Sequence, residues 1–182
     1  MSDKIQVKGK TFSRTLCEQD ILKEVKRVAS EINRDYAGKN PLFLGILNGS
    51  FMYAADLLKE IDIPCNISFV KLASYEGTVT TGVIREVIGL TEPIKDRDVI
   101  IIEDIVDTGF TMQRALETLG TREPASVKIT CLLNKPTKMK VDLGDALKYV
   151  ALTIPDDFIV GYGLDYDGFG RNYRDIYTIV EE

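Results

Sequence analysis

Short apolar segments alternate with helical segments through the middle of the chain. The run Pro41 to Leu47 is almost entirely apolar and ends at Asn48, and the run Val99 to Ile102 contains only β-branched residues. Continuous apolar runs of this length are typical of strands that are buried on both faces of a parallel sheet. Apolar residues at helical spacing predict one helix over Glu18 to Tyr36 and another over Phe51 to Glu60, with Ser50 as the cap of the second.

Further strands are predicted over residues 64–72, 83–88, 127–133, 149–154 and 176–180, and a further helix over 111–119. The alternation of strands and helices predicts an α/β fold, with a mainly parallel sheet and helices on both of its faces. The 182 residues fit a single domain with a full hydrophobic core. Because ligands bind where loops leave the carboxyl ends of such strands, we expect functional residues there.

The composition excludes several classes of function. Twenty-eight acidic residues against 23 basic ones give a formal net charge of −5, which argues against a nucleic-acid-binding face. The chain has no histidine, which removes Ser-His-Asp triads and imidazole zinc sites. No apolar run approaches the roughly 20 residues that cross a bilayer, and the N-terminus lacks a signal-peptide core. The cysteines Cys17, Cys65 and Cys131 are isolated, so we expect a cytoplasmic protein without membrane or nucleic-acid partners.

The most informative segment begins at the strand over residues 99–102. Two adjacent carboxylates, Glu103 and Asp104, follow it, and the string Asp107-Thr108-Gly109-Phe110-Thr111 then leads into a helix. Free amides at a helix start and threonine hydroxyls form an anion site. Adjacent carboxylates would repel a phosphate but suit ribose hydroxyls or a metal ion. A solvated turn with a helix cap would explain an acidic pair alone, but not the whole string.

This segment resembles the phosphoribosyl-pyrophosphate signature of the type I phosphoribosyltransferases. Four further segments make nearly the whole chain similar to the hypoxanthine-guanine phosphoribosyltransferases: residues 45–52, 72–82, 132–135 and 155–166. The resemblance implies the type I fold, with a flexible flap over about 73–82 and a base-binding hood formed by about 149–182 and the N-terminal strand. It implies a purine-salvage enzyme that joins phosphoribosyl pyrophosphate to N9 of hypoxanthine or guanine, with Mg²⁺ as cofactor, giving IMP or GMP and pyrophosphate.

On the sugar side, the resemblance assigns roles to the strongest segment. Asp107 matches the family's acid-base residue near purine N7. The phosphoribosyl group is expected to contact Glu103, Asp104, Thr108, Gly109, Phe110 and Thr111. Magnesium is expected at Glu103, Asp104 and Asp165.

The pyrophosphate is expected to contact Asn48, Gly49 and an arginine near the C-terminus. Both Arg171 and Arg174 are candidates, and the resemblance of the string around Arg174 to the family's ending selects Arg174. Relatives often have a basic residue where Asn48 stands and a lysine where Phe110 stands. We therefore expect weaker electrostatic attraction for the sugar substrate, compensated by backbone amides.

On the base side, Lys135 matches the family's lysine that reaches purine O6. An ammonium donor suits an exocyclic oxygen and not an amino group, which favours hypoxanthine or guanine over adenine. Phe158 is expected to stack on the base, and the backbone around Ile159 to read its Watson-Crick edge. Ser74 and Tyr75 belong to the flap, whose closure would exclude water.

Two alternatives remain open at this point. A phosphoribosyltransferase that prefers xanthine would also use Lys135, and a non-catalytic regulator could keep the same fold to sense a nucleotide. A regulator of nucleic acid would need a basic face, for which the acidic composition gives no support. The resemblance implies a homodimer or homotetramer, and it leaves the order of preference between hypoxanthine and guanine undetermined.

Overall fold

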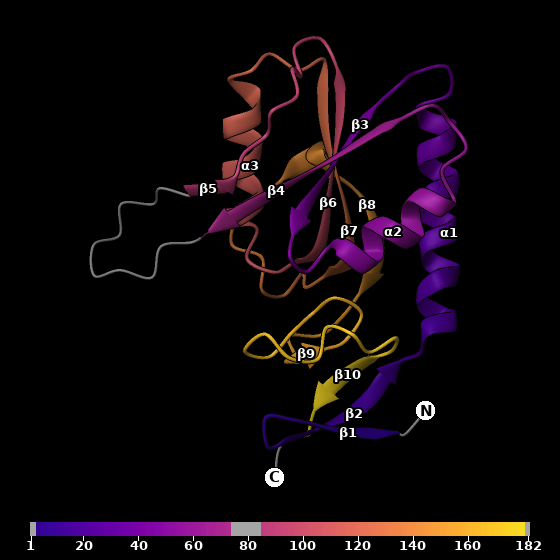
Figure 1. Ribbon diagram of the computed structural model, residues 1–182, viewed down its shortest axis with the longest axis vertical. Coiled ribbons are helices and arrows are strands. Elements are labelled where there is room, and N and C mark those ends of the chain that lie inside the picture. Colours follow the sequence, from indigo (N-terminus) through magenta and orange to yellow (C-terminus); the bar gives the residue numbers. More distant parts are fainter. Residues whose placement is uncertain (1–2, 74–84, 181–182) are drawn as a thin grey trace.

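The computed structural model of the chain describes residues 3–73 and 85–180, and within these ranges its centre is a six-stranded sheet (Figure 1). The strands are β3 (Leu42–Leu47), β4 (Asn66–Ala73), β5 (Arg85–Ile88), β6 (Asp98–Val106), β7 (Ser126–Asn134) and β8 (Leu147–Thr153). They lie in the order β5-β4-β3-β6-β7-β8, and all neighbouring pairs are parallel except β4 and β5. The prediction of a mainly parallel sheet is confirmed.

Helices cover both faces of this sheet, as predicted. The helices α1 (Glu18–Asp35) and α2 (Phe51–Lys59) lie on one face, and α3 (Phe110–Gly120) lies on the other (Figure 1). In β6, Ile100 and Ile102 pack in the cluster with α1 and α2, whereas Val99 and Ile101 pack in the cluster with α3. Because successive strand residues point to opposite faces, a strand covered on both sides requires such a continuous apolar run.

A second, smaller sheet lies at the end of the large sheet toward which the arrows of β3 and β8 point (Figure 1). It contains β1 (Lys4–Val7), β2 (Lys10–Leu16), β9 (Ile159–Val160) and β10 (Ile176–Ile179), all antiparallel, in the order β1-β2-β10-β9. It has a core of its own, formed by Val7, Phe12, Val160 and Tyr177. This sheet occupies the place of the expected hood.

The hood differs from the expectation in two ways. The strand β8 pairs with β7 in the large sheet, and its Tyr149 and Ala151 are buried in the cluster with α1, so the hood begins after β8 and not near residue 149. The N-terminal part contributes two strands, β1 and β2, and not one. The expected flap lies outside the described residues, apart from Ala73 in β4.

Two local features also differ from the sequence-based expectation. Glu103 and Asp104 belong to β6, which continues to Val106 because its pairing with β7 extends that far. Ser50 precedes α2 but does not cap it with its side chain, because its hydroxyl donates to the Ile46 carbonyl oxygen at 2.6 Å.

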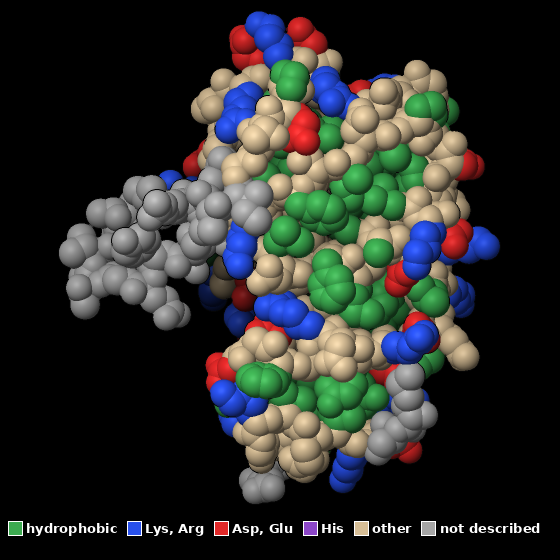
Figure 2. Space-filling view, viewed as in Figure 1, with side chains coloured by type: hydrophobic (Ala, Val, Ile, Leu, Met, Phe, Trp, Pro, Cys, Tyr) green, Lys and Arg blue, Asp and Glu red, His purple; other side chains and the backbone are tan. Residues whose placement is uncertain are grey.

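The surface carries apolar side chains on the face shown in Figure 2, where they gather over the region of β3, β4 and α2. Exposed residues of these elements include Phe51, Ile67 and Phe69. Among the helices of residues 3–73 and 85–180, none is long and apolar enough to cross a bilayer.

Candidate active site

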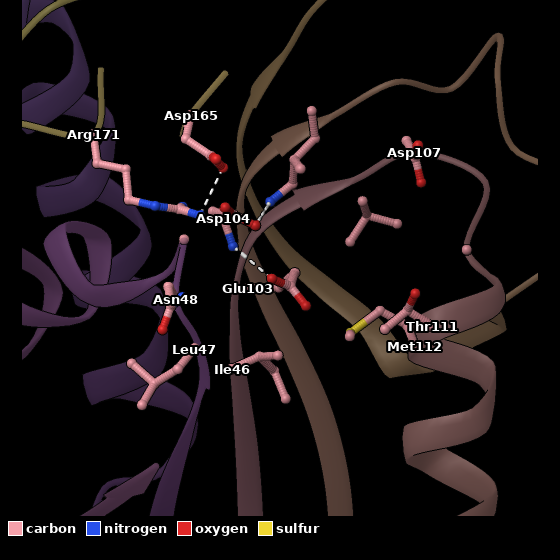
Figure 3. Close-up of a pocket in the computed structure, with 14 residues that line it drawn as sticks. Ile46, Leu47, Asn48, Glu103, Asp104, Asp107, Thr111, Met112, Asp165 and Arg171 are labelled. Atoms are coloured by element: carbon pink, nitrogen blue, oxygen red, sulfur yellow. Dashed lines mark hydrogen bonds and ion pairs between the residues drawn. The ribbon is translucent and has the colours of Figure 1, made fainter. Parts of the chain in front are cut away.

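A pocket of about 330 Å³ lies where β3 and β6 end and faces the segment that follows β9 (Figure 3). Fourteen residues line it: Ile46, Leu47, Asn48, Gly49, Glu103, Asp104, Ile105, Val106, Asp107, Gly109, Thr111, Met112, Asp165 and Arg171. The position at the carboxyl ends of parallel strands is the one that the fold predicts for a ligand.

Glu103 and Asp104 are adjacent residues of β6 that both line this pocket. The Asp104 N–H donates to Glu103 Oε1 at 3.1 Å, and the Ile105 N–H donates to Asp104 Oδ1 at 2.8 Å. Burial, followed by the charges of Asp104 and then Asp107, raises the pKa of Glu103 well above its usual value. Burial also raises the pKa of Asp104. Because burial disfavours the ionised form of both carboxyl groups, a cation or hydroxyl donors beside them would stabilise that form.

Two glycines let the loop after β3 approach these carboxylates. A Cβ atom at Gly49 would overlap the Asp104 carboxylate, and a Cβ atom at Gly163 would overlap the Gly49 carbonyl oxygen. The peptide bond between Leu47 and Asn48, at the start of this loop, is cis. The loop therefore presents backbone groups, and no bulky side chain at Gly49, to whatever enters the pocket.

The loop between β6 and α3 supplies the helix start that the sequence predicts. Gly109 precedes α3 with φ +84°, a conformation that favours glycine. The first amides of a helix have no partner within it, and here the Gln113 N–H already bonds to the Gly109 carbonyl. Of the expected phosphate-binding residues, Gly109 and Thr111 line the pocket, whereas Thr108 does not, and Phe110 is 53% exposed.

Asp107 also lines the pocket, at the start of the same loop (Figure 3). Its Oδ1 accepts a hydrogen bond from the Thr108 N–H, and its Oδ2 lies 3.6 Å from Lys138 Nζ. One carboxylate oxygen is thus held by the backbone and the other faces a cation.

Of the two candidate arginines, Arg171 lines the pocket, whereas Arg174, which the resemblance selects, does not. Arg171 Nη2 lies 2.6 Å from Asp165 Oδ1, and Nη1 donates to the Gly163 carbonyl at 2.7 Å. Arg174 is 62% exposed and pairs with Glu18 at 3.0 Å. The reason is the turn at 167–170, where three residues have positive φ and direct the chain back toward the pocket.

The residues expected to bind the base form a group beside the pocket. Lys135 is only 6% exposed, and its Nζ donates to the Asp157 carbonyl at 2.6 Å and to Asp156 Oδ1 at 3.2 Å. Phe158 is half exposed and meets Tyr166 edge to face, with 5.5 Å between ring centroids. Ile159 is buried in β9.

Lys138 and Asp156 are charged residues at this site that the sequence-based reasoning missed. Lys138 Nζ lies between Asp107 Oδ2 and Asp156 Oδ1, at 3.6 and 3.4 Å, and so joins the base group to the pocket. No sequence signal marked them, because charged residues in loops after strands are usually solvated. Leu47 and Met112 also line the pocket, and no sequence signal marked these apolar residues either. Ser74 and Tyr75 lie outside the described residues.

The charges around the pocket define what it can hold. Among the described residues that line it, four carboxylates face one arginine, Arg171. A free phosphate would meet a net negative charge, whereas a divalent cation, sugar hydroxyls or a metal-bound diphosphate would be favoured. The start of α3 at Thr111 lies at the opposite side of the pocket from Arg171 (Figure 3), where it could hold a second anionic group.

Comparison with known proteins gives a consistent result. The model of the phosphoribosyl transferase domain family matches residues 15–167. A hypoxanthine-guanine phosphoribosyltransferase of Staphylococcus aureus is 42% identical over 168 residues, which cover 92% of this chain and 93% of that protein. A protein of the same name from Streptococcus pneumoniae is 42% identical over 90% of both chains.

Solved structures show the same similarity. A hypoxanthine-guanine phosphoribosyltransferase from Bacillus anthracis superposes with a TM-score of 0.86 at 36% identity, covering 93% of this chain and 97% of that one. A hypoxanthine phosphoribosyltransferase from Staphylococcus aureus gives a TM-score of 0.86 at 41% identity, covering 92% and 91%. The chain therefore belongs to the phosphoribosyltransferase family and, within it, to the hypoxanthine-guanine phosphoribosyltransferases.

Proposed function

We propose that this chain transfers the phosphoribosyl group of phosphoribosyl pyrophosphate to N9 of hypoxanthine or guanine and releases pyrophosphate, as an enzyme of purine salvage. One observation carries the proposal. The pocket brings together the acidic pair at the end of β6, a helix start suited to a phosphate and the glycine loop after β3. These three features match the ribose, the 5-phosphate and the diphosphate of that substrate.

The ribose would lie against Glu103 and Asp104. Ionised carboxylates only accept hydrogen bonds, so each can receive a bond from a ribose hydroxyl. Their negative charge would also favour positive charge on the sugar as its bond to pyrophosphate breaks. The 5-phosphate would bind the amides at the start of α3 and the Thr111 hydroxyl, near Gly109. Thr108 and Phe110 would contribute through the backbone of this loop.

The oxygen donors of the pocket fit Mg²⁺. Within residues 3–73 and 85–180, no group of three or more His, Cys, Asp or Glu side chains is arranged to hold a metal by itself. Mg²⁺ usually binds one or two carboxylates together with substrate phosphates and water, and Glu103, Asp104 and Asp165 offer such carboxylates. When bound with the substrate, the ion would neutralise charge on the diphosphate.

Arg171 and the loop of Asn48 and Gly49 would hold the diphosphate. Arg171 already points its guanidinium into the pocket, bonded to Asp165 (Figure 3). Gly49 lets backbone atoms come close to the acidic pair, and hence to a diphosphate bound there with a cation. Asn48 supplies no cation, so backbone groups and Arg171 would bear this part of the binding.

Asp107 would act as the acid-base residue near purine N7. Its carboxylate lines the pocket next to the place proposed for the anomeric carbon. General acid-base help is typically worth about 10²–10⁴-fold, so positioning and electrostatics would supply the remainder of the rate.

Lys135 would select a 6-oxopurine. An ammonium group has three donors, and two are engaged by Asp157 and Asp156. The third can bond a purine O6, whereas it would oppose the donor hydrogens of an adenine amino group. Phe158 keeps a half-exposed ring that can stack on the base, beside the β9 backbone at Ile159.

The test is pyrophosphate release from phosphoribosyl pyrophosphate and Mg²⁺, with hypoxanthine, guanine, xanthine and adenine offered separately. Turnover with hypoxanthine or guanine and not with adenine is expected. Turnover with xanthine alone would replace the proposed base. Binding of the sugar substrate without turnover of any base would point to a nucleotide-sensing regulator instead.

The proposal also includes the cellular compartment and the oligomeric state of the enzyme. We place it in the cytoplasm and in a homodimer or homotetramer, acting as a single domain over residues 1–182. The exposed Phe51, Ile67 and Phe69 support self-association, because apolar patches on soluble proteins often mark protein interfaces.

A further inference from the structure

The loop that follows β7 is fixed to the loop that carries Asp107. The Lys135 N–H donates to the Val106 carbonyl and the Lys140 N–H donates to the Thr108 carbonyl, each at 3.0 Å. These two bonds attach the loop to the residues immediately before and after Asp107. The backbone between Lys135 and Lys140 is therefore held in register with the proposed acid-base residue.

Four charged side chains form a continuous chain across this junction. Lys135 Nζ and Lys138 Nζ both lie close to Asp156 Oδ1, at 3.2 and 3.4 Å, and Lys138 Nζ also lies 3.6 Å from Asp107 Oδ2. The order is Lys135, Asp156, Lys138 and Asp107, with alternating charge. One end is the residue proposed to read purine O6, and the other is the residue proposed to act near N7.

Lys138 occupies the central position of this chain. Asp107 Oδ1 is bound by the Thr108 N–H, so Oδ2 is the oxygen whose direction a neighbouring cation can fix. Asp107 also shares its pocket with other carboxylates, Glu103 among them, which repel its charge. A cation beside Asp107, such as Lys138 at 3.6 Å, opposes that repulsion and favours one position of the carboxylate.

We propose that Lys138 is a positioning residue for the reaction, which sets Asp107 directly and Lys135 through Asp156, so that the groups at the O6 and N7 edges of the purine are fixed together. This inference rests on the proposed function. It goes beyond it by assigning a role to a lysine that need not touch the substrate. The opposing view is that Lys138 makes an ordinary surface ion pair, since its side chain is 37% exposed.

The experiment measures steady-state kinetics with hypoxanthine and phosphoribosyl pyrophosphate as the varied substrates. Lys138→Met keeps the length of the side chain and removes its charge. We expect kcat/KM for hypoxanthine to fall about tenfold, while the KM for phosphoribosyl pyrophosphate stays within about twofold. Lys138→Arg restores the cation and should recover kcat/KM to within about threefold of the wild type.

A double variant tests whether Lys138 acts through Asp107. If it does, Lys138→Met lowers kcat little further once Asp107→Asn has removed the charge that Lys138 holds. Asp156→Asn should raise the KM for hypoxanthine, because Lys135 then loses a charged partner. Lys95→Met is the matched control. Lys95 lies in a loop before β6, its side chain is 65% exposed, and its Nζ lies 2.7 Å from Glu123 Oε2.

The outcomes separate the inference from the proposed function. Wild-type enzyme without turnover of any purine overturns both. Active wild type with Lys138→Met indistinguishable from Lys95→Met overturns the inference alone. Two further outcomes overturn the inference alone. One is a Lys138→Met variant that loses affinity for both substrates together with thermal stability, because this indicates a structural role only. The other is full additivity of Lys138→Met with Asp107→Asn, because Lys138 then does not act through Asp107.

Discussion

At the scale of single residues, two arginines three positions apart have different surroundings. Arg171 bonds Asp165 inside the pocket, and Arg174 pairs with Glu18 at the surface. Arg171→Ala should raise the KM for phosphoribosyl pyrophosphate by about 10- to 100-fold, the usual cost of losing hydrogen bonds to a charged group. Arg174→Ala should change it by less than about twofold, since an exposed ion pair contributes little. A larger effect from Arg174→Ala in the same kinetic assay would reverse the assignment.

The sequence alone brings the acidic residues of the pocket together but does not identify its arginine, and this difference has a physical reason. Glu103 and Asp104 lie in β6 and Asp107 directly follows it, so the strand alone fixes where they lie and the sequence shows them together. Arg171 reaches the same pocket through a turn of several residues with positive φ, whose path depends on contacts with Gly163. Sequence spacing cannot choose between Arg171 and Arg174 in such a turn.

At the scale of elements, the end of α1 is joined to β8 by a single carboxylate. Lys148 Nζ lies 2.8 Å from Asp35 Oδ2, and the Tyr149 hydroxyl donates to the same oxygen at 3.0 Å. The bond from Lys148, and then that from Tyr149, lowers the pKa of Asp35 from 3.8 to about 2. The ionised carboxylate thus stabilises the folded state above about pH 4, and this contribution is lost as the pH falls toward 2.

The prediction is that Asp35→Asn lowers the free energy of unfolding more at about pH 6 than at about pH 3, measured by urea denaturation. Glu123→Gln is the control, because its ion pair with Lys95 is exposed and should contribute little at either pH. An effect of Asp35→Asn that is equal at both pH values would mean that the bonds to Lys148 and Tyr149 do not stabilise the charged form.

The elements themselves were predictable where a periodic pattern was long. Helix α1 has five buried apolar residues at helical spacing, and the sequence locates it to within one residue. The hairpin of β1 and β2 was not predicted as two strands, because its turn at Lys8 and Gly9 gives a weak turn signal. The strand β9 has two residues, too few for any period, and only its pairing with β10 defines it.

At the scale of the whole molecule, the site lies between two sheets. The small sheet has a core of its own, and its Ile159 and Ile176 also pack in the core that the large sheet forms with α1 and α2. The acidic pair and the phosphate loop come from the large sheet, whereas Asp165 and Arg171 come from the segment that follows β9 of the small one. Binding a substrate that contacts both groups requires the two sheets to keep a fixed relation. That relation depends on contacts between the sheets that sequence periodicity does not describe.

Asp175 is one such contact, and it carries the last prediction. Its side chain is buried beside β10, and its Oδ1 accepts the Glu18 N–H at 2.8 Å, so the small sheet caps α1 of the large one. Cys17, at the capping position, makes no side-chain bond of this kind. Asp175→Ala should lower the free energy of unfolding by about 1–2 kcal/mol, and Asp175→Asn, which keeps an acceptor oxygen, by less.

The lower free energy of unfolding should be the same for both sheets if the chain unfolds as one unit. Far-UV circular dichroism follows α1, α2 and α3, which pack on the large sheet, and hydrogen exchange of β10 amides follows the small one. The two measurements on Asp175→Ala should give the same decrease in stability. A decrease confined to β10 would show that the small sheet opens alone, and then closure of the base-binding group over the sugar pocket would be a separate step of the reaction.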